Sequence, residues 1–266
     1  MPEGDTVWLA GRRLDQALSG RRLVRSDFRV PQLATTDLSG RTVLGVASRG
    51  KHLLTRIEGG LTLHTHFKME GSWQIYRPGQ RWRALEHQRH QIRVVLANPE
   101  AVCVGVRLAV VELLPSAQED EAVGHLGPDL LAEGWGPDAE LEALQRLSRD
   151  PDREIGSALL DQRNLAGLGN LWRCEVLFLR GIHPYRHVAS VTDLPRLIDL
   201  SHRLLLANRE RAGQSATGDL RRGGSNYVYA RKGLPCRRCH TPIQRAPQGE
   251  PGYERETYWC PRCQPA

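Results

Sequence analysis

The pattern of apolar and polar positions changes near the middle of the chain. In the first 115 residues, short β-branched or alternating apolar runs are separated by Gly, Pro, Asn or Asp, which is typical of strands. These runs are residues 23–30, 42–50, 52–59, 61–67, 72–77, 90–97 and 101–113. A helix is expected before them at residues 5–19, where the apolar positions form one imperfect face. The first part is therefore predicted to be a β-sandwich with a helix packed on it.

The second part shows helical spacing instead. Apolar residues recur there every three or four positions, in residues 139–150, 154–165, 169–181 and 194–211. The polar stretch from Pro115 to Pro128 links the two parts, and the tail from Gly223 is typical of a small β-hairpin. We predict an α+β, multidomain protein with an N-terminal β-sandwich domain at residues 1–120, a helical domain at 121–224 and a hairpin at 225–266.

Composition places the chain among soluble globular proteins. Its 266 residues are 40% hydrophobic and 25% charged. No apolar run approaches the ~20 residues that span a bilayer, and the acidic first residues lack the apolar segment of a secretory signal. We therefore expect a cytoplasmic protein with no membrane partner.

The charge is positive and concentrated at the end of the chain. The formal net charge is +7, and residues 221–266 hold nine basic and three acidic side chains. This pattern favours a polyanionic partner over a merely solvated basic tail. Lysine occurs only at Lys51, Lys68 and Lys232. Because arginine cannot replace lysine where chemistry needs a deprotonated amine, each lysine is a weak candidate for chemistry, although genome composition can cause the same bias.

Four of the six cysteines form two C-x2-C pairs, Cys236 with Cys239 and Cys260 with Cys263. Twenty residues separate the pairs, and this spacing is typical of one structural zinc ion held by four thiolates. Two redox motifs or disulfides are the alternative. The remaining Cys103 and Cys174 lie in apolar segments and are expected in the core. Unpaired thiols agree with a reducing compartment.

A glycine-rich turn, AGLGN at residues 166–170, lies between two predicted helices. Its glycines allow a tight turn and a close approach of a ligand to the backbone. Asn170 is a candidate N-cap, and the backbone N–H groups at such a helix start can bind phosphate. A packing turn is the alternative, but the basic tail favours phosphate binding.

Six segments in order resemble the formamidopyrimidine-DNA glycosylase and endonuclease VIII (Fpg/Nei) family. They are PEGD at the start, SRGKHLL at 48–54, HLGPDLL at 125–131, LLDQRNLAGLGN at 159–170, RKGLPCRRC at 231–239 and RETYWCPRC at 255–263. The PEG start and the LLDQ…LAGLGN wording favour the endonuclease VIII branch. The resemblance implies a two-layered β-sandwich joined to a helix-two-turn-helix domain and a zinc hairpin. It also implies damaged DNA as the partner, no organic cofactor, a monomer and a nucleoid-associated location.

The resemblance implies the catalytic residues as well. Pro2, exposed once Met1 has been removed, matches the nucleophile that forms an iminium with the opened sugar. A terminal amine titrates near 8, so part of it is neutral at cellular pH. Glu3 matches the carboxylate that moves protons during base removal. Lys51 matches the proton donor in β-elimination, and Arg255 the residue that contacts phosphate and is assigned to δ-elimination.

The HFKMEGSW segment matches the loop that fills the gap left by a flipped nucleotide, with Lys68 beside the apolar wedge Met69. A core methionine on a strand is the alternative for Met69. The chain departs from the family at Asp5 and Thr6, and in the loop at Glu70, where some relatives have an aromatic residue. His125 replaces an arginine and is expected to contact phosphate more weakly.

The sequence therefore predicts a bifunctional DNA glycosylase and AP lyase that acts on oxidised pyrimidines in duplex or single-stranded DNA. A non-catalytic binder of damaged DNA and a purine-preferring glycosylase on the same scaffold are alternatives. An RNA-binding zinc-ribbon protein would explain the tail but not the first three residues.

Overall fold

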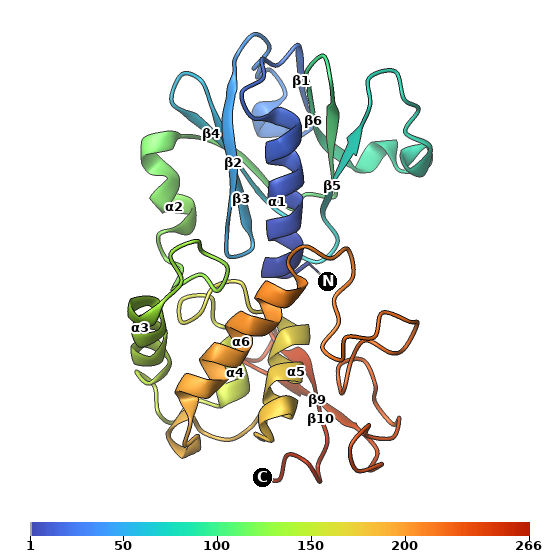
Figure 1. Ribbon diagram of the computed structural model, residues 1–266. Helices are drawn as coiled ribbons and strands as arrows, with labels where there is room; N and C mark the ends of the chain where they lie inside the picture. Colours follow the sequence, from blue (N-terminus) through green and yellow to red (C-terminus); the bar gives the residue numbers. More distant parts are fainter. Residues whose placement is uncertain (1) are drawn as a thin grey trace. The chain divides into compact units, whose positions relative to one another are not determined.

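The computed structural model describes residues 2–266, which form two compact units, residues 2–125 and 126–266 (Figure 1). The first unit begins with helix α1 (Gly4–Leu18) and contains two antiparallel four-stranded sheets. One sheet has the order β1 (Arg25–Phe28), β6 (Ile92–Ala97), β7 (Val102–Val106) and β5 (Ser72–Tyr76). The other has the order β2 (Val43–Arg49), β3 (His52–Ile57), β4 (Leu61–His66) and β8 (Val110–Pro115). The predicted β-sandwich with its helix is confirmed.

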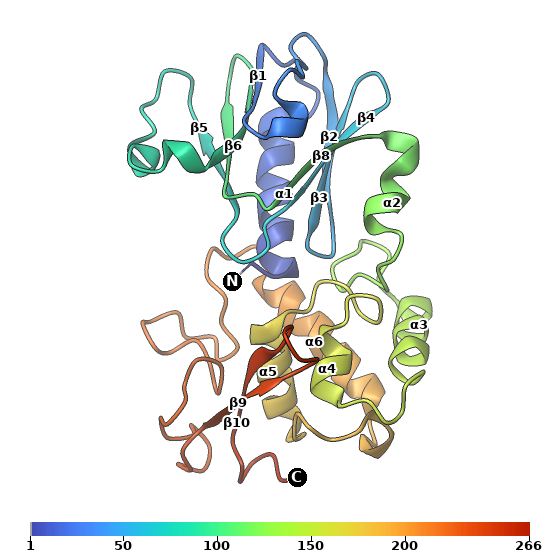
Figure 2. The same cartoon turned by 180° about the vertical axis from the view of Figure 1, so that it is seen from behind.

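Strand alternation divides the residues of the second sheet between its two faces. Leu53 and Ile57 of β3 point into the sandwich core, which they share with Leu63 of β4 and with Leu14 of α1. Helix α1 packs so closely on this sheet that a Cβ at Gly11 would lie 2.9 Å from the Leu53 side chain. The other face of β3 and β4 carries mostly polar residues, such as Arg56, Thr62 and His64. Helix α2 (Glu119–Val123) lies beside this sheet (Figure 2).

Two expectations for the first unit are wrong. The run at residues 101–113 is not one strand, because the chain reverses at Arg107, which has a φ of 51°, and sends β7 and β8 into different sheets. Equally apolar residues on both sides of Arg107 hide this turn. The stretch expected to be a plain polar link contains α2, whose acidic first turn suits a helix N-terminus.

The second unit contains the predicted helices and the hairpin. They are α3 (Pro137–Leu147), α4 (Ile155–Leu160), α5 (Asn170–Arg180), α6 (Leu194–Asn208), β9 (Gln244–Gln248) and β10 (Arg255–Trp259). Short 3-10 helices occur in both units. The first unit contains η1 (Pro31–Leu33), η2 (Arg83–Leu85), η3 (Arg89–Gln91) and η4 (Ser116–Gln118), and the second contains η5 (Val188–Ser190). Helix α4 ends at Leu160, five residues before the predicted end at residue 165. The chain turns after Leu160, and Gly167 in this turn has a φ of 97°.

The turn after α4 is held by the segment that opens the second unit. The Gly127 N–H donates to the Gln162 carbonyl, and the Ala166 N–H donates to the Pro128 carbonyl, each at 2.9 Å. A Cβ at Gly127 would lie 2.6 Å from the Arg163 carbonyl oxygen, so only glycine permits this approach. Two segments that resemble the family, 125–131 and 159–170, are therefore neighbours in space.

No helix of residues 2–266 is both long and apolar enough to cross a membrane.

Candidate active site and nucleic-acid interface

The start of α1 holds two buried carboxylates. Glu3 is the N-cap residue and is fully buried, and Asp5 is 2% exposed. The Asp5 carboxylate accepts a hydrogen bond from the Thr6 N–H at 2.8 Å. Pro2, directly before them, is partly exposed. Because N–H groups at a helix start carry partial positive charge, carboxylates are favoured at this position.

Lys51 lies at the tip of a tight hairpin. Arg49 pairs with His52, so Gly50 and Lys51 form a two-residue turn between β2 and β3. Gly50 has a φ of 58°, as the first central residue of such turns requires. The SRGKH segment therefore places a lysine at a fixed point, on a turn that the glycine makes possible.

Helix α1 brings its first residues to the same end as this tip. The Asp15 carboxylate accepts from the Val46 N–H at 2.9 Å, and a Cβ at Gly11 would lie 3.7 Å from Ser48 Cβ. Four residues of an α-helix and two residues of a strand both advance by about 6 Å, so α1 and β2 stay in step along their length. The first turn of α1 and the turn between β2 and β3 therefore lie at the same end of the first unit (Figures 1 and 2).

The predicted wedge loop lies at this end as well. His52 of β3 pairs with His66 of β4, so the end of β4 lies beside the Lys51 turn. Met69 is 53% exposed in the following loop and is therefore not a core residue. A hollow of about 480 Å³ adjoins Met69 and is also lined by Arg107, whose guanidinium pairs with the Glu70 carboxylate at 3.0 Å. Arg107 comes from the β7–β8 turn, and nothing in the sequence pattern pointed to it.

Sequence reasoning also missed a histidine cluster beside Lys51. Glu112 accepts from His64 Nδ1 at 3.0 Å, and His64 Nε2 lies 2.8 Å from His52 Nδ1. When His64 is neutral, its Nδ1 carries the proton, so its Nε2 accepts from His52. The His66 ring lies 4.6 Å from the His52 ring, and the predicted phosphate contact His125 lies 6.1 Å from it. Alternation along β3 and β4 would have indicated one shared face.

Two members of this cluster resist protonation. Burial, followed by the neighbouring His66 and His64, lowers the pKa of His52 to about 3. Burial, followed by the nearby Lys68 and Lys51, lowers the pKa of His66 to about 4. Because His66 Nδ1 accepts the Lys68 N–H at 2.9 Å, neutral His66 carries its proton on Nε2. His66 therefore presents a neutral hydrogen-bond donor near the two lysines.

We expect acid to destabilise the first unit through these histidines. In the unfolded chain a histidine titrates near 6.5, so below that pH the unfolded state binds protons that His52 and His66 of the folded state do not bind. Stability is complete above about pH 6.5 and falls as the pH drops toward 4. The melting temperature measured from pH 7.5 to 4.5 should fall less steeply for His52→Gln than for the native chain. The exposed His87→Gln is the control, and equal slopes for all three proteins would contradict the expectation.

In the second unit the structure brings Asn170 and the Arg255 strand together. Asn170 Nδ2 donates to the Glu256 carbonyl at 2.9 Å. The N-cap prediction is wrong by one residue: Gly169 is the N-cap of α5, and Asn170 is the first helical residue, with its side chain turned to β10 instead of to its own helix. Arg255 is exposed, and the hairpin around it lines a hollow of about 850 Å³ together with residues 150–163.

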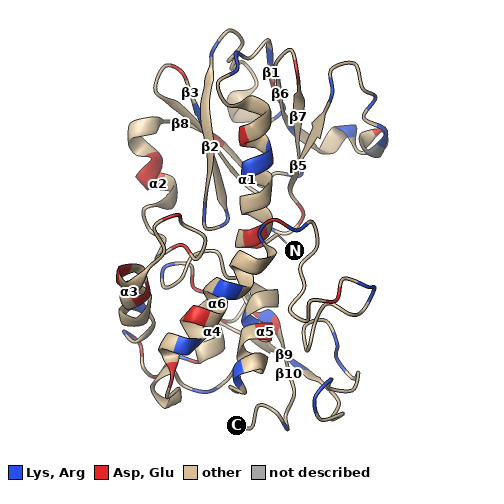
Figure 3. Ribbon diagram, viewed as in Figure 1, with Lys and Arg blue, Asp and Glu red and all other residues tan. Residues whose placement is uncertain are grey.

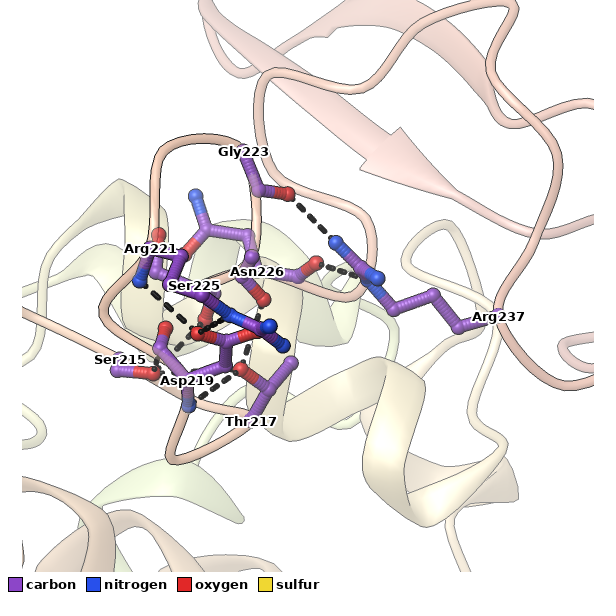
Figure 4. A network of polar contacts seen from close by, with 9 residues as sticks. Ser215, Thr217, Asp219, Arg221, Gly223, Ser225, Asn226 and Arg237 are labelled. Carbon is purple, nitrogen blue, oxygen red and sulfur yellow. Dashed lines mark hydrogen bonds and ion pairs between the residues drawn. The ribbon is translucent and has the colours of Figure 1, made fainter.

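A loop outside helices and strands connects α6 to the cysteines. Ser215 Oγ donates to the Asp219 carbonyl at 3.0 Å, and Thr217 Oγ1 donates to the Gly224 carbonyl at 2.8 Å. Figure 4 shows how Arg237 reaches this loop, with its Nε 3.0 Å from the Asn226 carbonyl oxygen. The loop is thus closed on itself and joined to the first C-x2-C turn.

The four paired cysteines form one cluster. Their Sγ atoms all lie within 4.8 Å of one another. Cys236 and Cys263 are 3.9 Å apart, and Cys239 and Cys260 are 3.4 Å apart. Four thiolates 2.3 Å from a tetrahedral ion would be separated by about 3.8 Å, so the set fits a metal ion. These distances exclude disulfides in this structure, and Cys103 and Cys174 are buried as expected.

Charge is distributed unevenly over the elements (Figure 3). Acidic residues mark α2 and the first turn of α3, whereas Lys and Arg recur in the loops that follow α6. A polyanion would therefore be attracted to the loops and hairpin after α6.

Comparison with known proteins agrees with this geometry. The family model for the formamidopyrimidine-DNA glycosylase N-terminal domain matches residues 1–108, and the model for the H2TH domain of the same glycosylase matches residues 126–205. The chain is 54% identical to "Probable endonuclease 8 2" of Streptomyces coelicolor, over 99% of this chain and 94% of that protein. It is 43% identical to "DNA-(apurinic or apyrimidinic site) lyase Nei2" of Mycolicibacterium smegmatis, over the whole of both.

A solved structure supports the same assignment. Wild-type Fpg of Lactococcus lactis, in complex with DNA that contains an oxidised pyrimidine, superposes with a TM-score of 0.81 at 25% identity over the full length of both chains. The fold class predicted from sequence is thereby confirmed. The chain belongs to the formamidopyrimidine-DNA glycosylase and endonuclease VIII (Fpg/Nei) family, in its endonuclease VIII-like branch.

Proposed function

We propose that this protein is a bifunctional DNA glycosylase and AP lyase of base excision repair that removes oxidised pyrimidines. The observation that carries the proposal is the convergence of Pro2, Lys51 and Met69 at one end of the first unit. A binder without chemistry has no need for a terminal amine, buried carboxylates and a turn lysine in one place. The relative named as a lyase supports the second activity.

Pro2 acts as the nucleophile after Met1 has been removed. The lone pair of its nitrogen attacks C1′, the glycosidic bond breaks, and the base leaves with a proton. Ring opening at O4′ then yields an iminium between the Pro2 nitrogen and C1′. Glu3, buried at the helix start directly after Pro2, moves protons at the sugar and the base during these steps.

Lys51 serves the lyase step. Loss of a proton from C2′ of the iminium breaks the C3′–O3′ bond, and Lys51 protonates the leaving oxygen. Its position on a two-residue turn fixes where the ammonium can reach. His52 and His66 beside it are neutral, so they add no positive charge to that of the Lys51 ammonium.

Met69 supports base flipping. A damaged nucleotide must leave the stack before C1′ can be attacked, at a cost of a few kcal/mol. An exposed methionine at a loop tip can fill the gap as an apolar wedge, and Lys68 beside it can meet a phosphate. His125, exposed beside His52, is proposed as a further phosphate contact.

The second unit holds the DNA backbone. Asn170 and Arg255 are proposed to bind phosphates, Arg255 also in δ-elimination. Zn²⁺ is the proposed ion of the four cysteines, which would hold it through four thiolates and leave no open coordination position, so its contribution is structural. We further propose a monomer in the cytoplasm near the nucleoid, acting on duplex or single-stranded DNA, with residues 1–120, 121–224 and 225–266 as functional parts.

We expect thymine glycol, 5-hydroxypyrimidines and dihydrouracil to be excised faster than 8-oxoguanine paired with cytosine. Ring-saturated pyrimidines are non-planar and stack poorly, so flipping them costs less than flipping a planar oxidised purine. A single exposed apolar wedge, Met69, is then enough to fill the gap that the flipped nucleotide leaves. Single-turnover rates on matched duplexes that differ only in the lesion measure this preference.

The same assay separates the alternatives. Faster release of 8-oxoguanine would make the enzyme purine-preferring and overturn the proposed substrate class. Tight binding of every lesion without base release or strand cleavage would identify a non-catalytic binder of damaged DNA.

A further inference from the structure

Arg173 connects four elements of the second unit from a fully buried position in α5. Its guanidinium donates to Gly156 O at 3.3 Å, Gln248 Oε1 at 3.1 Å, Asn170 Oδ1 at 2.5 Å and Thr257 Oγ1 at 2.5 Å. These acceptors belong to α4, β9, α5 and β10. A planar fork of donors with acceptors from four elements holds all of them in one arrangement.

Arg173 also decides which way the Asn170 amide faces. A guanidinium has donors only, so Asn170 must turn its oxygen toward Arg173. The amide nitrogen then faces β10, where one of its two hydrogens is donated to the Glu256 carbonyl. The other hydrogen remains for an acceptor. A phosphate only accepts hydrogen bonds, so this orientation is the one a DNA backbone needs.

Gln248 completes the connection to the hairpin. It is 3% exposed and pairs directly with Arg255 across the two strands. Its Oε1 accepts from Arg173 and from Thr257 Oγ1, and its Nε2 donates to Glu154 Oε2 at 2.9 Å and to the Pro184 carbonyl at 2.8 Å. The position of the strand opposite Arg255 is thus determined by a buried amide.

We propose that Arg173 and Gln248 are positioning residues that set Asn170 and Arg255 as a matched pair of phosphate-binding groups. The inference rests on the proposed function, in which those two residues bind the DNA backbone. Neither Arg173 nor Gln248 needs to touch DNA, since both are buried. Their effect is to fix one donor on α5 and one cation on β10 at a constant separation.

The substitution Gly156→Ala tests this without removing any group of the network. A Cβ at Gly156 would lie 2.3 Å from Gln248 Oε1 and 2.9 Å from its Cδ, so the amide must leave its place. Alanine itself favours the helix in which Gly156 lies. Gly134→Ala is the matched control, because a Cβ there meets nothing within 4 Å.

Binding to a duplex with a stable abasic-site analogue is measured from low to moderate salt. We expect Gly156→Ala to weaken binding about tenfold and to reduce the slope of log K against log salt by about one, as for a lost phosphate contact. Gly134→Ala should match the native chain. Adding Asn170→Ala should cost much less in the Gly156→Ala background than alone, because the contact is already misplaced.

Each outcome decides a different claim. If the native chain neither binds nor cleaves damaged DNA, the proposed function fails. Suppose that the native chain both binds and cleaves damaged DNA. The positioning role is then wrong if Gly156→Ala keeps the native slope of log K against log salt. It is also wrong if the affinity losses of Gly156→Ala and Asn170→Ala add fully in the double variant. Thr257→Val, which removes one acceptor of Arg173, gives a second variant with the same expected slope should Gly156→Ala melt below the assay temperature.

Discussion

Borohydride is expected to trap a covalent complex between the mature chain and DNA that carries an abasic site. In the proposed mechanism the Pro2 nitrogen, once terminal, forms an iminium with the opened sugar, and reduction would convert it to a stable amine. The start of α1 favours this chemistry, because Glu3 and Asp5 are buried beside Pro2 and the Lys51 turn lies at the same end. Gel electrophoresis under denaturing conditions measures the trapped fraction, and intact mass reports whether Met1 has been removed.

Three variants locate the nucleophile. A chain that retains Met1 has an amide at Pro2 and should trap nothing, whereas Pro2→Gly keeps a terminal primary amine and should trap weakly. Glu3→Gln should lose base excision but still trap a preformed abasic site, because that step no longer requires glycosidic cleavage. Strong trapping by the chain that retains Met1 would show that the nucleophile is Lys51 or another amine, not Pro2.

Removal of the metal ion is expected to unfold the C-terminal hairpin and to abolish DNA binding. The hairpin has a small core, in which Cys236 and Cys260 pack with Phe178, and the Arg238 guanidinium lies 4.4 Å from the Phe178 ring. Metal binding contributes about 10–16 kcal/mol to the folding of isolated zinc-finger peptides, far more than so few contacts supply. Hydrogen exchange after chelation should show loss of protection in residues 225–266 while the β-sandwich stays protected.

A single cysteine variant should reproduce the effect of chelation. Cys239→Ser removes one thiolate, whereas Arg262→Ala alters an exposed residue between two of the ligands and should keep the hairpin folded. If a metal-free Cys239→Ser protein bound DNA with native affinity, DNA binding would not require the cysteine cluster. Retained protection of residues 225–266 would show that the hairpin folds without an ion.

The sequence by itself determined the class of most elements, although not that of α2. β-Branched or alternating apolar runs marked seven strand segments, helical spacing of apolar residues marked five helices, and two C-x2-C pairs predicted one four-cysteine cluster. These signals are local, since each depends on residues within a turn or a few strand positions of one another. The family could be predicted for the same reason, because its segments are short and carry their chemistry in adjacent residues.

Only the tertiary structure decided how distant positions meet. The reversal at Arg107 sends two halves of one apolar run into different sheets, and β-strand register puts Glu112, His64 and His52 in one chain of hydrogen bonds. Arg173 and Thr257 are 84 residues apart in sequence yet share a hydrogen bond. A buried arginine in a helix pattern looks like any polar residue until its acceptors are known. Long-range partners are chosen by packing and by the need to satisfy every buried donor, and neither leaves a periodic trace in the chain.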